Sequence, residues 1–175
     1  MWKGLVAGLA GGLVASWTMN RFQDVWFTLS ENSRGSVGVR VEEQGEERST
    51  NDHAEEQDDT TVKTASAISE GIFDHKLTID EKRIAGSAVH YALGTGVGGL
   101  YGAVAEVVPE VTSGAGLPFG AAFWLIVDET AVPVLGLAKP PTKYPVSTHV
   151  YALTSHLVYG LTTEAVRLGL RRTLL

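Results

Sequence analysis

The chain has 175 residues, no cysteine and a formal net charge of −6 at pH 7. This length suggests one domain. The lack of cysteine excludes disulfides and thiol chemistry, and the lack of a concentrated basic patch argues against nucleic-acid binding. The mean hydropathy of +0.06 would suit a soluble protein, but most acidic residues lie between Glu31 and Glu81. The rest of the chain is strongly apolar, so we expect a membrane protein with one acidic loop.

Four stretches satisfy the requirement of about 20 mostly apolar residues for a transmembrane helix. They cover residues 5–27, 84–108, 115–137 and 148–170. The first continues to an aromatic end, which argues against a cleaved signal peptide. Helices that are apolar all round would leave no polar outer face in water, and glycine costs stability in soluble helices. We therefore predict an all-α fold, a polytopic membrane four-helix bundle in which residues 1–175 form a single membrane domain.

A long acidic loop, residues 30–76, separates the first two segments. Residues 32–59 are polar and charged, so we expect disorder there. Residues 61–73 are predicted to form a short amphipathic helix at the membrane surface, because apolar side chains recur at helical spacing at Val62, Ala65, Ile68 and Ile72. Thr78 followed by Glu81 predicts a capping box that begins the second span.

Glycines spaced by four residues mark helix faces on which small residues allow close helix packing. These glycines are Gly4, Gly8 and Gly12, then Gly94, Gly98 and Gly102, then Gly116 and Gly120, with Gly160 in the last segment. Packing among the chain's own helices explains these faces. Self-association through one of them is the alternative.

The sequence also contains a weak internal repeat. Residues 7–12 align with residues 115–120, which places Gly8 with Gly116 and Gly12 with Gly120. The run Tyr101–Glu106 resembles Tyr159–Glu164, each with a histidine upstream. The chain therefore reads as two parallel helical hairpins related by a pseudo-two-fold axis along the membrane normal, with the acidic loop inserted in the first.

Ionisable groups inside a span are costly and by default mark a functional site. One polar layer is expected in the half of the bundle near the long loop, formed by Asn20, Asp24, His90, Asp128, Glu129, His149 and His156. A second layer is expected toward the opposite surface, formed by Tyr101, Glu106, Tyr159 and Glu164.

Three interpretations of the first layer stay open. It can be a satisfied interhelical network, a path for protons or ions, or a metal or haem site that uses His90, His149 and His156 with Asp128 or Glu129. No compact spacing of histidines supports the metal, so no metal or cofactor is predicted. The run Gly94–Gly99 has no preceding strand, and no nucleophile or phosphate-binding motif is present. We therefore expect no enzymatic activity and no catalytic residues.

Residues 77–102 carry the more specific motif. It begins Leu-Thr-Ile-Asp-Glu-Lys, continues through His90-Tyr91 and Gly94-Thr95-Gly96, and ends on Tyr101-Gly102. This motif resembles the YagU-like family of small bacterial inner-membrane proteins, whose function is unknown. The resemblance implies a multi-pass location in the bacterial inner membrane and a link to acid tolerance. It supplies no catalytic residues.

The function expected from these features is a non-catalytic helix-packing or accessory subunit of a membrane complex. Its partners would be the lipid bilayer and other membrane subunits or a second copy of the chain, with no nucleic acid. The alternative is a small transporter or a proton- or ion-conducting bundle that uses the histidine and carboxylate layer. A haem- or metal-binding membrane subunit is the lesser alternative.

Overall fold

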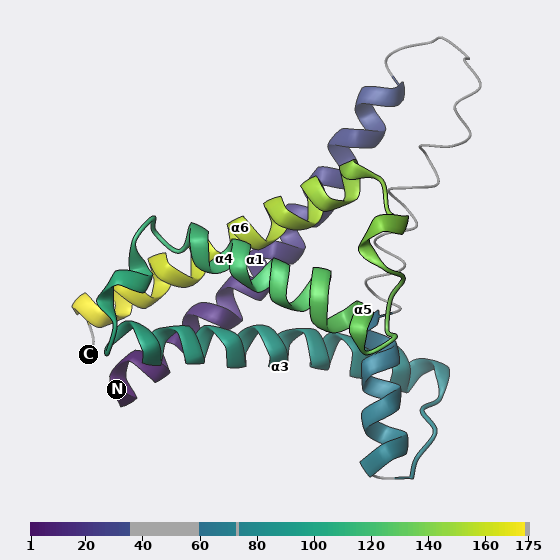
Figure 1. Ribbon diagram of the computed structural model, residues 1–175, viewed down its shortest axis with the longest axis horizontal. Helices are drawn as coiled ribbons and strands as arrows, with labels where there is room; N and C mark the ends of the chain where they lie inside the picture. The colour runs from purple at the N-terminus through teal and green to yellow at the C-terminus, as the bar shows by residue number, and fades with distance from the viewer. Residues whose placement is uncertain (36–59, 73, 174–175) are drawn as a thin grey trace.

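The structure is a computed structural model that describes residues 1–35, 60–72 and 74–173. Regular secondary structure in these ranges is all helical, as predicted. Besides a helix over residues 60–72, the long helices in Figure 1 are α1 (Trp2–Gly35), α3 (Ile79–Ala105), α4 (Leu117–Ile126) and α6 (Val146–Thr173). The short elements are the 3₁₀ helices η1 (Pro109–Thr112) and η3 (Pro141–Lys143), the π-helical turn η2 (Val127–Ala131) and the single turn α5 (Val132–Val134). The predicted disorder of residues 32–59 lies outside the described residues from residue 36 onward.

The helix bounds differ from the predicted segments by a few residues at most ends, and three differences matter for the fold. α1 continues to Gly35, so residues 30–35 are helical and not part of a loop. α3 ends at Ala105 and not at residue 108, because Pro109 restricts the residue before it, and Val108 has the non-helical angles φ −126° and ψ 81°. The third predicted segment, residues 115–137, is not one α-helix but the succession of α4, η2 and α5.

The predicted capping box at the start of α3 is confirmed. The Thr78 hydroxyl accepts a hydrogen bond from the Glu81 N–H at 3.5 Å, and the Glu81 carboxylate accepts one from the Thr78 N–H at 2.7 Å. These two bonds satisfy backbone donors that the first helical turn leaves without a partner. The hydrogen bonds from Thr78 hold the pKa of Glu81 below its usual value.

Among the four long helices, α1 packs against α3 and α6, and α4 packs against α6. α1 runs antiparallel to both of its neighbours, and Figure 1 shows α4 between α6 and α3. The beginning of α1 and the last turn of α6 lie close together, because Glu106, just after α3, pairs with the Met1 amino group at 3.8 Å and with Arg171 at 2.6 Å. Long side chains bridge the space between α3 and α4, as in the stacking of Tyr101 on Phe119 with ring centroids 4.1 Å apart.

Glycines bring α1 and α3 into backbone contact. A methyl group on Gly98 would lie 2.6 Å from the Cα atom of Gly12 and 2.7 Å from the carbonyl oxygen of Gly8. A methyl group on Gly12 would likewise overlap the carbonyl oxygen of Gly94. Neither position can hold a larger residue unless the helices move apart. The glycine spacing of α1 and α3 is therefore used within the chain.

The α4–α6 pair repeats these contacts, but in a different register from the sequence alignment. The position of Gly116 faces the carbonyl oxygen of Gly160 and the Glu164 side chain, as Gly4 faces Gly102 and Glu106. Gly4 therefore corresponds to Gly116, one helical turn from the predicted partner. The predicted pairs Gly8 with Gly116 and Gly12 with Gly120 are wrong. The correct alignment matches Gly-Leu-x-x-Gly at residues 4–8 with Gly-Leu-x-x-Gly at residues 116–120.

The helix over residues 60–72 exists as predicted, but only part of the predicted apolar face packs against the described helices. Ala65 and Ser69 are buried, and the Val62 side chain lies against Gly86 of α3. Ile68 and Ile72 are instead 44% and 71% exposed. Small residues pack inward because the helix lies close to the beginning of α3, and this leaves the isoleucines on the outside.

The distribution of side chains is the reverse of that in a soluble bundle. The side chains buried among the described helices are small or polar and include Ser16, Ser155, His156, Thr163, Glu164 and Arg167. Large apolar side chains lie outside, among them Leu13, Trp17, Leu100, Leu125 and Ile126. In the described part of the chain, one helical stretch is long and apolar enough to cross a membrane by length and composition, Leu117–Val134, and 6% of it is buried.

Candidate functional site

The π-helical turn η2 brings two consecutive carboxylates toward α6. The N–H of Val132 donates to the carbonyl of Val127, five residues back, and Pro133 has no N–H to continue the α-helical pattern. Consecutive residues of an α-helix point about 100° apart, whereas this wider turn lets both Asp128 and Glu129 reach the same neighbour. Single π-helical turns inside α-helices occur frequently at functional sites.

Each carboxylate meets a histidine of α6. Glu129 Oε1 lies 2.7 Å from His149 Nδ1, and Asp128 Oδ2 lies 3.7 Å from His156 Nδ1. The two histidines are seven residues apart, so they share one face of α6. The structure therefore assembles four of the seven predicted residues of the first layer into two pairs on neighbouring helices.

The two pairs differ in how their hydrogen bonds are satisfied. His149 Nε2 also lies 3.2 Å from the carbonyl oxygen of Pro141. Both of its ring nitrogens therefore face acceptors, and both bonds form only when the ring carries two protons. His156 Nδ1 lies at hydrogen-bond distance, 2.9 Å, from the carbonyl oxygen of Ala152. Its distance of 3.7 Å from Asp128 is too long for a hydrogen bond. Among the described residues, none donates a hydrogen bond to the Asp128 carboxylate, whose side chain is 31% exposed.

The exposed part of Asp128 faces two cavities inside the bundle. The larger of these, which we call the inner cavity, has a volume of about 280 Å³ and is bounded by all four long helices and the helix over residues 60–72. Its polar lining includes His90, Asp128 and His156, and its walls include Met19, Leu93 and Phe123. A smaller cavity of about 110 Å³ lies between Asp128 and the Glu129–His149 pair.

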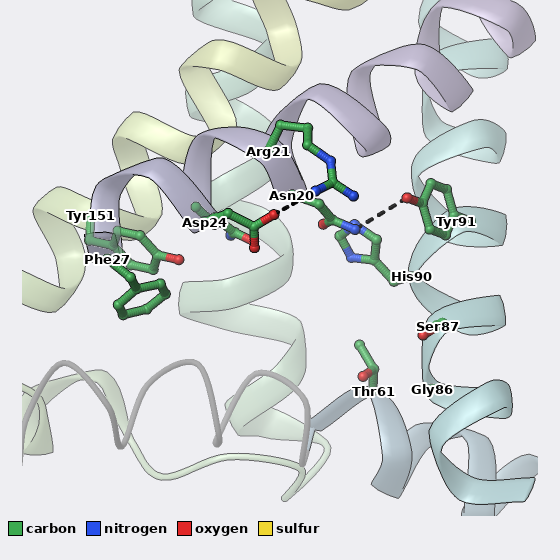
Figure 2. Close-up of a pocket in the computed structure, with 11 residues that line it drawn as sticks. Asn20, Arg21, Asp24, Phe27, Thr61, Gly86, Ser87, His90, Tyr91 and Tyr151 are labelled. Atoms are coloured by element: carbon green, nitrogen blue, oxygen red, sulfur yellow. Dashed lines mark hydrogen bonds and ion pairs between the residues drawn. The ribbon is translucent and has the colours of Figure 1, made fainter. Parts of the chain in front are cut away.

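A third cavity, the polar vestibule, lies beside the inner cavity and has a volume of about 360 Å³. Figure 2 shows its lining, with Asn20 and Asp24 of α1 across from His90 and Tyr91 of α3. His90 and Thr61 line both the vestibule and the inner cavity. The histidine therefore stands between a polar compartment and the compartment that holds Asp128.

The remaining residues of the first layer are less deeply placed. The Asn20 amide donates to the Tyr91 hydroxyl at 3.2 Å. Asp24 pairs at 3.0 Å with Arg21, and both side chains are exposed. Asp24 thus belongs to the rim of the vestibule and does not meet the histidines of α6.

The second predicted layer is divided as well. Glu164 accepts a hydrogen bond from Tyr101 at 2.9 Å and two from Arg167, at 2.6 and 2.7 Å, in a buried cluster. Glu106 binds Arg171, which lies about one helical turn beyond Arg167 on α6. Tyr159 belongs to neither carboxylate, because it donates to the carbonyl oxygen of Gly94 at 2.5 Å and lines the inner cavity.

Sequence reasoning missed the two arginines as partners of these glutamates. Arg167 follows Glu164 by three residues, a spacing at which helical side chains interact, so this pair was detectable. The Arg171–Glu106 pair joins α6 to the end of α3 and depends on the fold. Tyr91 of α3 and Tyr151 of α6 in the vestibule were likewise not predicted, because their role depends on which faces of α3 and α6 meet α1.

The three histidines do not gather into one metal site. His149 and His156 bind different carboxylates, and His90 lines the inner cavity from α3. Within residues 1–35, 60–72 and 74–173, no three side chains of histidine, aspartate or glutamate are placed to hold a metal ion together. The geometry therefore gives no support to the haem or metal alternative.

Comparison with known proteins gives a family but no activity. No curated protein and no solved structure matches the chain. One family model matches residues 50–165, which include α3, η2 with both carboxylates, and both histidines of α6. The match covers most of the chain, and the protein therefore belongs to the family described as a protein of unknown function (DUF1440).

Proposed function

We propose that the protein is a multi-pass inner-membrane protein whose four long helices span the bilayer. The reversed distribution of side chains supports this proposal, because large apolar residues outside and polar residues inside suit lipid and would aggregate in water. α1, α3 and α6 fall short of the composition expected for a span because their inner faces carry glycine, serine, threonine, tyrosine and histidine. The motif at residues 77–102 supports the finer assignment to the YagU-like family.

Within this frame the proposed activity is transport, with a proton bound and released at the histidine and carboxylate pairs. The observation that carries the proposal is Asp128, a partly buried carboxylate that faces two cavities and accepts no hydrogen bond from the described residues. A purely structural network would give such a group donors, because a carboxylate that is turned away from bulk water without them is costly. The His156 ring lies 3.7 Å from this carboxylate and completes the pair at which the proton would be passed on.

Proton flux into liposomes tests this proposal. The full chain is reconstituted, a pH gradient is imposed, and the internal pH is followed with a trapped dye. Asp128→Asn should reduce the flux at least tenfold. The matched control is Glu110→Gln, which removes one carboxylate from the exposed helix η1 outside the cavities. Equal flux through the two variants would refute the mechanism.

The accessory subunit remains the second candidate, and α4 is the observation in its favour. This helix packs against α6 while its other sides are largely open. Lipid or a partner helix could cover this surface. The glycine faces no longer support a partner, because the glycines of α1, α3 and α6 named above contact one another within the chain. Purification in mild detergent decides between them: a monodisperse monomer with no co-purifying protein contradicts the accessory role.

A further inference from the structure

We propose that the inner cavity binds a small organic ammonium ion, with the Asp128 carboxylate as its counter-charge. The inference deepens the proposed transport function and rests on it for the movement of the ion, whereas the binding step stands alone. It is drawn from the size of the cavity, its charge, its acceptors and its aromatic wall.

The cavity has the form of a site for a small, partly apolar ligand. Its volume of about 280 Å³ lies near the lower end of the range of roughly 300–1,000 Å³ that is common for ligand sites. Most of its wall is apolar, with Val89 and Leu93 from α3, Val132 and Leu135 from the end of α4 and its continuation, and Met19 from α1. A small inorganic cation needs polar ligands on all sides, and this mostly apolar lining does not provide them. The ligand should therefore carry an apolar body.

The charge at one end of the cavity favours a cation. Of the described residues that line it, none is a lysine or an arginine, and Asp128 is the one carboxylate. Among the described residues none donates a hydrogen bond to this carboxylate, and the nearest basic side chain is that of His156, at 3.7 Å. An ammonium group supplies the missing donors in a charge-assisted hydrogen bond, and an anionic ligand would meet repulsion instead.

Hydroxyl groups around the cavity are arranged as acceptors. Ser16 donates its own proton to the Gly12 carbonyl at 2.9 Å, and Thr64 donates to the Thr60 carbonyl at 2.8 Å. Each oxygen therefore keeps its lone pairs for a donor in the cavity. A ligand with N–H groups fits these acceptors, whereas a carboxylate or phosphate does not.

Aromatic rings complete the site. Phe123 and Tyr159 both line the cavity, with ring centroids 5.1 Å apart and planes tilted by 54°. The faces of such rings attract organic cations. Phe123 also lies 5.2 Å from the His156 ring in an edge-to-face arrangement, so the aromatic wall adjoins the charged end.

Isothermal titration of the detergent-purified full chain with phenethylammonium chloride tests the binding step. We expect saturable binding at pH 7, no binding of 3-phenylpropionate, which has a similar body and the opposite charge, and at least tenfold weaker binding to Asp128→Asn. Glu110→Gln should bind like the unchanged chain. Equal binding to the two carboxylate variants, or preference for the anion, overturns the inference.

A second variant covers the case in which Asp128→Asn does not fold. Ala131→Leu places extra carbon atoms at a position that lines the cavity and leaves Asp128 in place. It should abolish phenethylammonium binding while circular dichroism and gel filtration stay unchanged. Retained binding would overturn the inference.

The liposome assay separates this inference from the proposed function. Benzylguanidinium, a cation that keeps its N–H groups and its charge at neutral pH and so hardly crosses the bilayer as a free base, should inhibit proton flux because it competes with the proton for Asp128. If Asp128→Asn reduces the flux but the cation does not, the ligand inference is refuted and the proton-transport proposal is not. Cation binding without any flux overturns transport and leaves the site.

Discussion

Replacing Gly98 of α3 with alanine tests whether backbone contact with α1 stabilises the bundle. The added methyl carbon would lie 2.6 Å from the Gly12 Cα atom, where ordinary contact begins at 3.4 Å. The helices would have to separate by roughly 0.8 Å, and the atoms that obstruct the methyl group belong to the backbone, so no side chain can rotate away. Such overpacking costs about 1–3 kcal/mol.

Gly96 provides the matched control on the same helix, because an added methyl carbon there meets no atom within 4 Å. Both substitutions gain the same helix propensity, about 1 kcal/mol, so this gain cancels in the comparison. Gly98→Ala should therefore melt lower than Gly96→Ala by roughly 2–12 °C, at about 2–4 °C per kcal/mol for a chain of this size. Thermal unfolding in detergent, followed by circular dichroism, gives both values. Equal melting temperatures would show that the α1–α3 contact does not hold the bundle together.

Two further predictions concern the first turn of α3 and the buried ion pair. Thr78→Ala should lower stability by about 1 kcal/mol, because the N-cap acceptor is lost; an unchanged melting curve contradicts this role. The pKa of Glu81 is lowered in the folded chain. The ionised Glu81 carboxylate therefore stabilises the fold at pH values above its unfolded-state pKa, and this stabilisation is lost as the pH falls through its folded-state pKa. The melting difference between the unchanged chain and Glu81→Gln should therefore disappear in acid, and a constant difference would refute it. Arg167→Met should cost about 3–5 kcal/mol, because it leaves Glu164 buried and unpaired, whereas Arg171→Met, at a more exposed pair, should cost less than about 1 kcal/mol; equal losses in denaturation would contradict the difference in burial.

The spacing of residues was enough to predict an all-helical chain and the glycine faces on which its helices meet. Four-residue spacing places glycines on one side of a helix, and the structure puts Gly94, Gly98 and Gly102 against α1. The same spacing could not set the register of the repeat. Shifting α1 by one turn keeps glycines on the same face, so the alignments through Gly4 and through Gly8 look alike until backbone contacts distinguish them.

The candidate site was only partly predictable for a related reason. Depth along an ideal helix places Asp128 and His156 at a similar level, and the structure brings them within 3.7 Å. The π-helical turn changes which way Asp128 and Glu129 point, and the only sequence hint of it is Pro133. Ile68 and Ile72 show a second reason. Their spacing predicts an apolar face, but it does not show whether a membrane or another helix covers that face.

The paired tyrosines have a mechanical consequence. Backbone contacts through glycine hold α1 to α3 and α4 to α6, and glycine has no side chain whose rotation could loosen them. Each pair should therefore move as one rigid body. Tyr101 of α3 donates to Glu164 of α6, and Tyr159 of α6 donates to the Gly94 carbonyl of α3, so the two bodies are latched by one hydroxyl from each. Gly11 of α1 also lies against the Thr163 backbone of α6, so releasing both latches would loosen α3 from α6 while the α1–α6 contact holds.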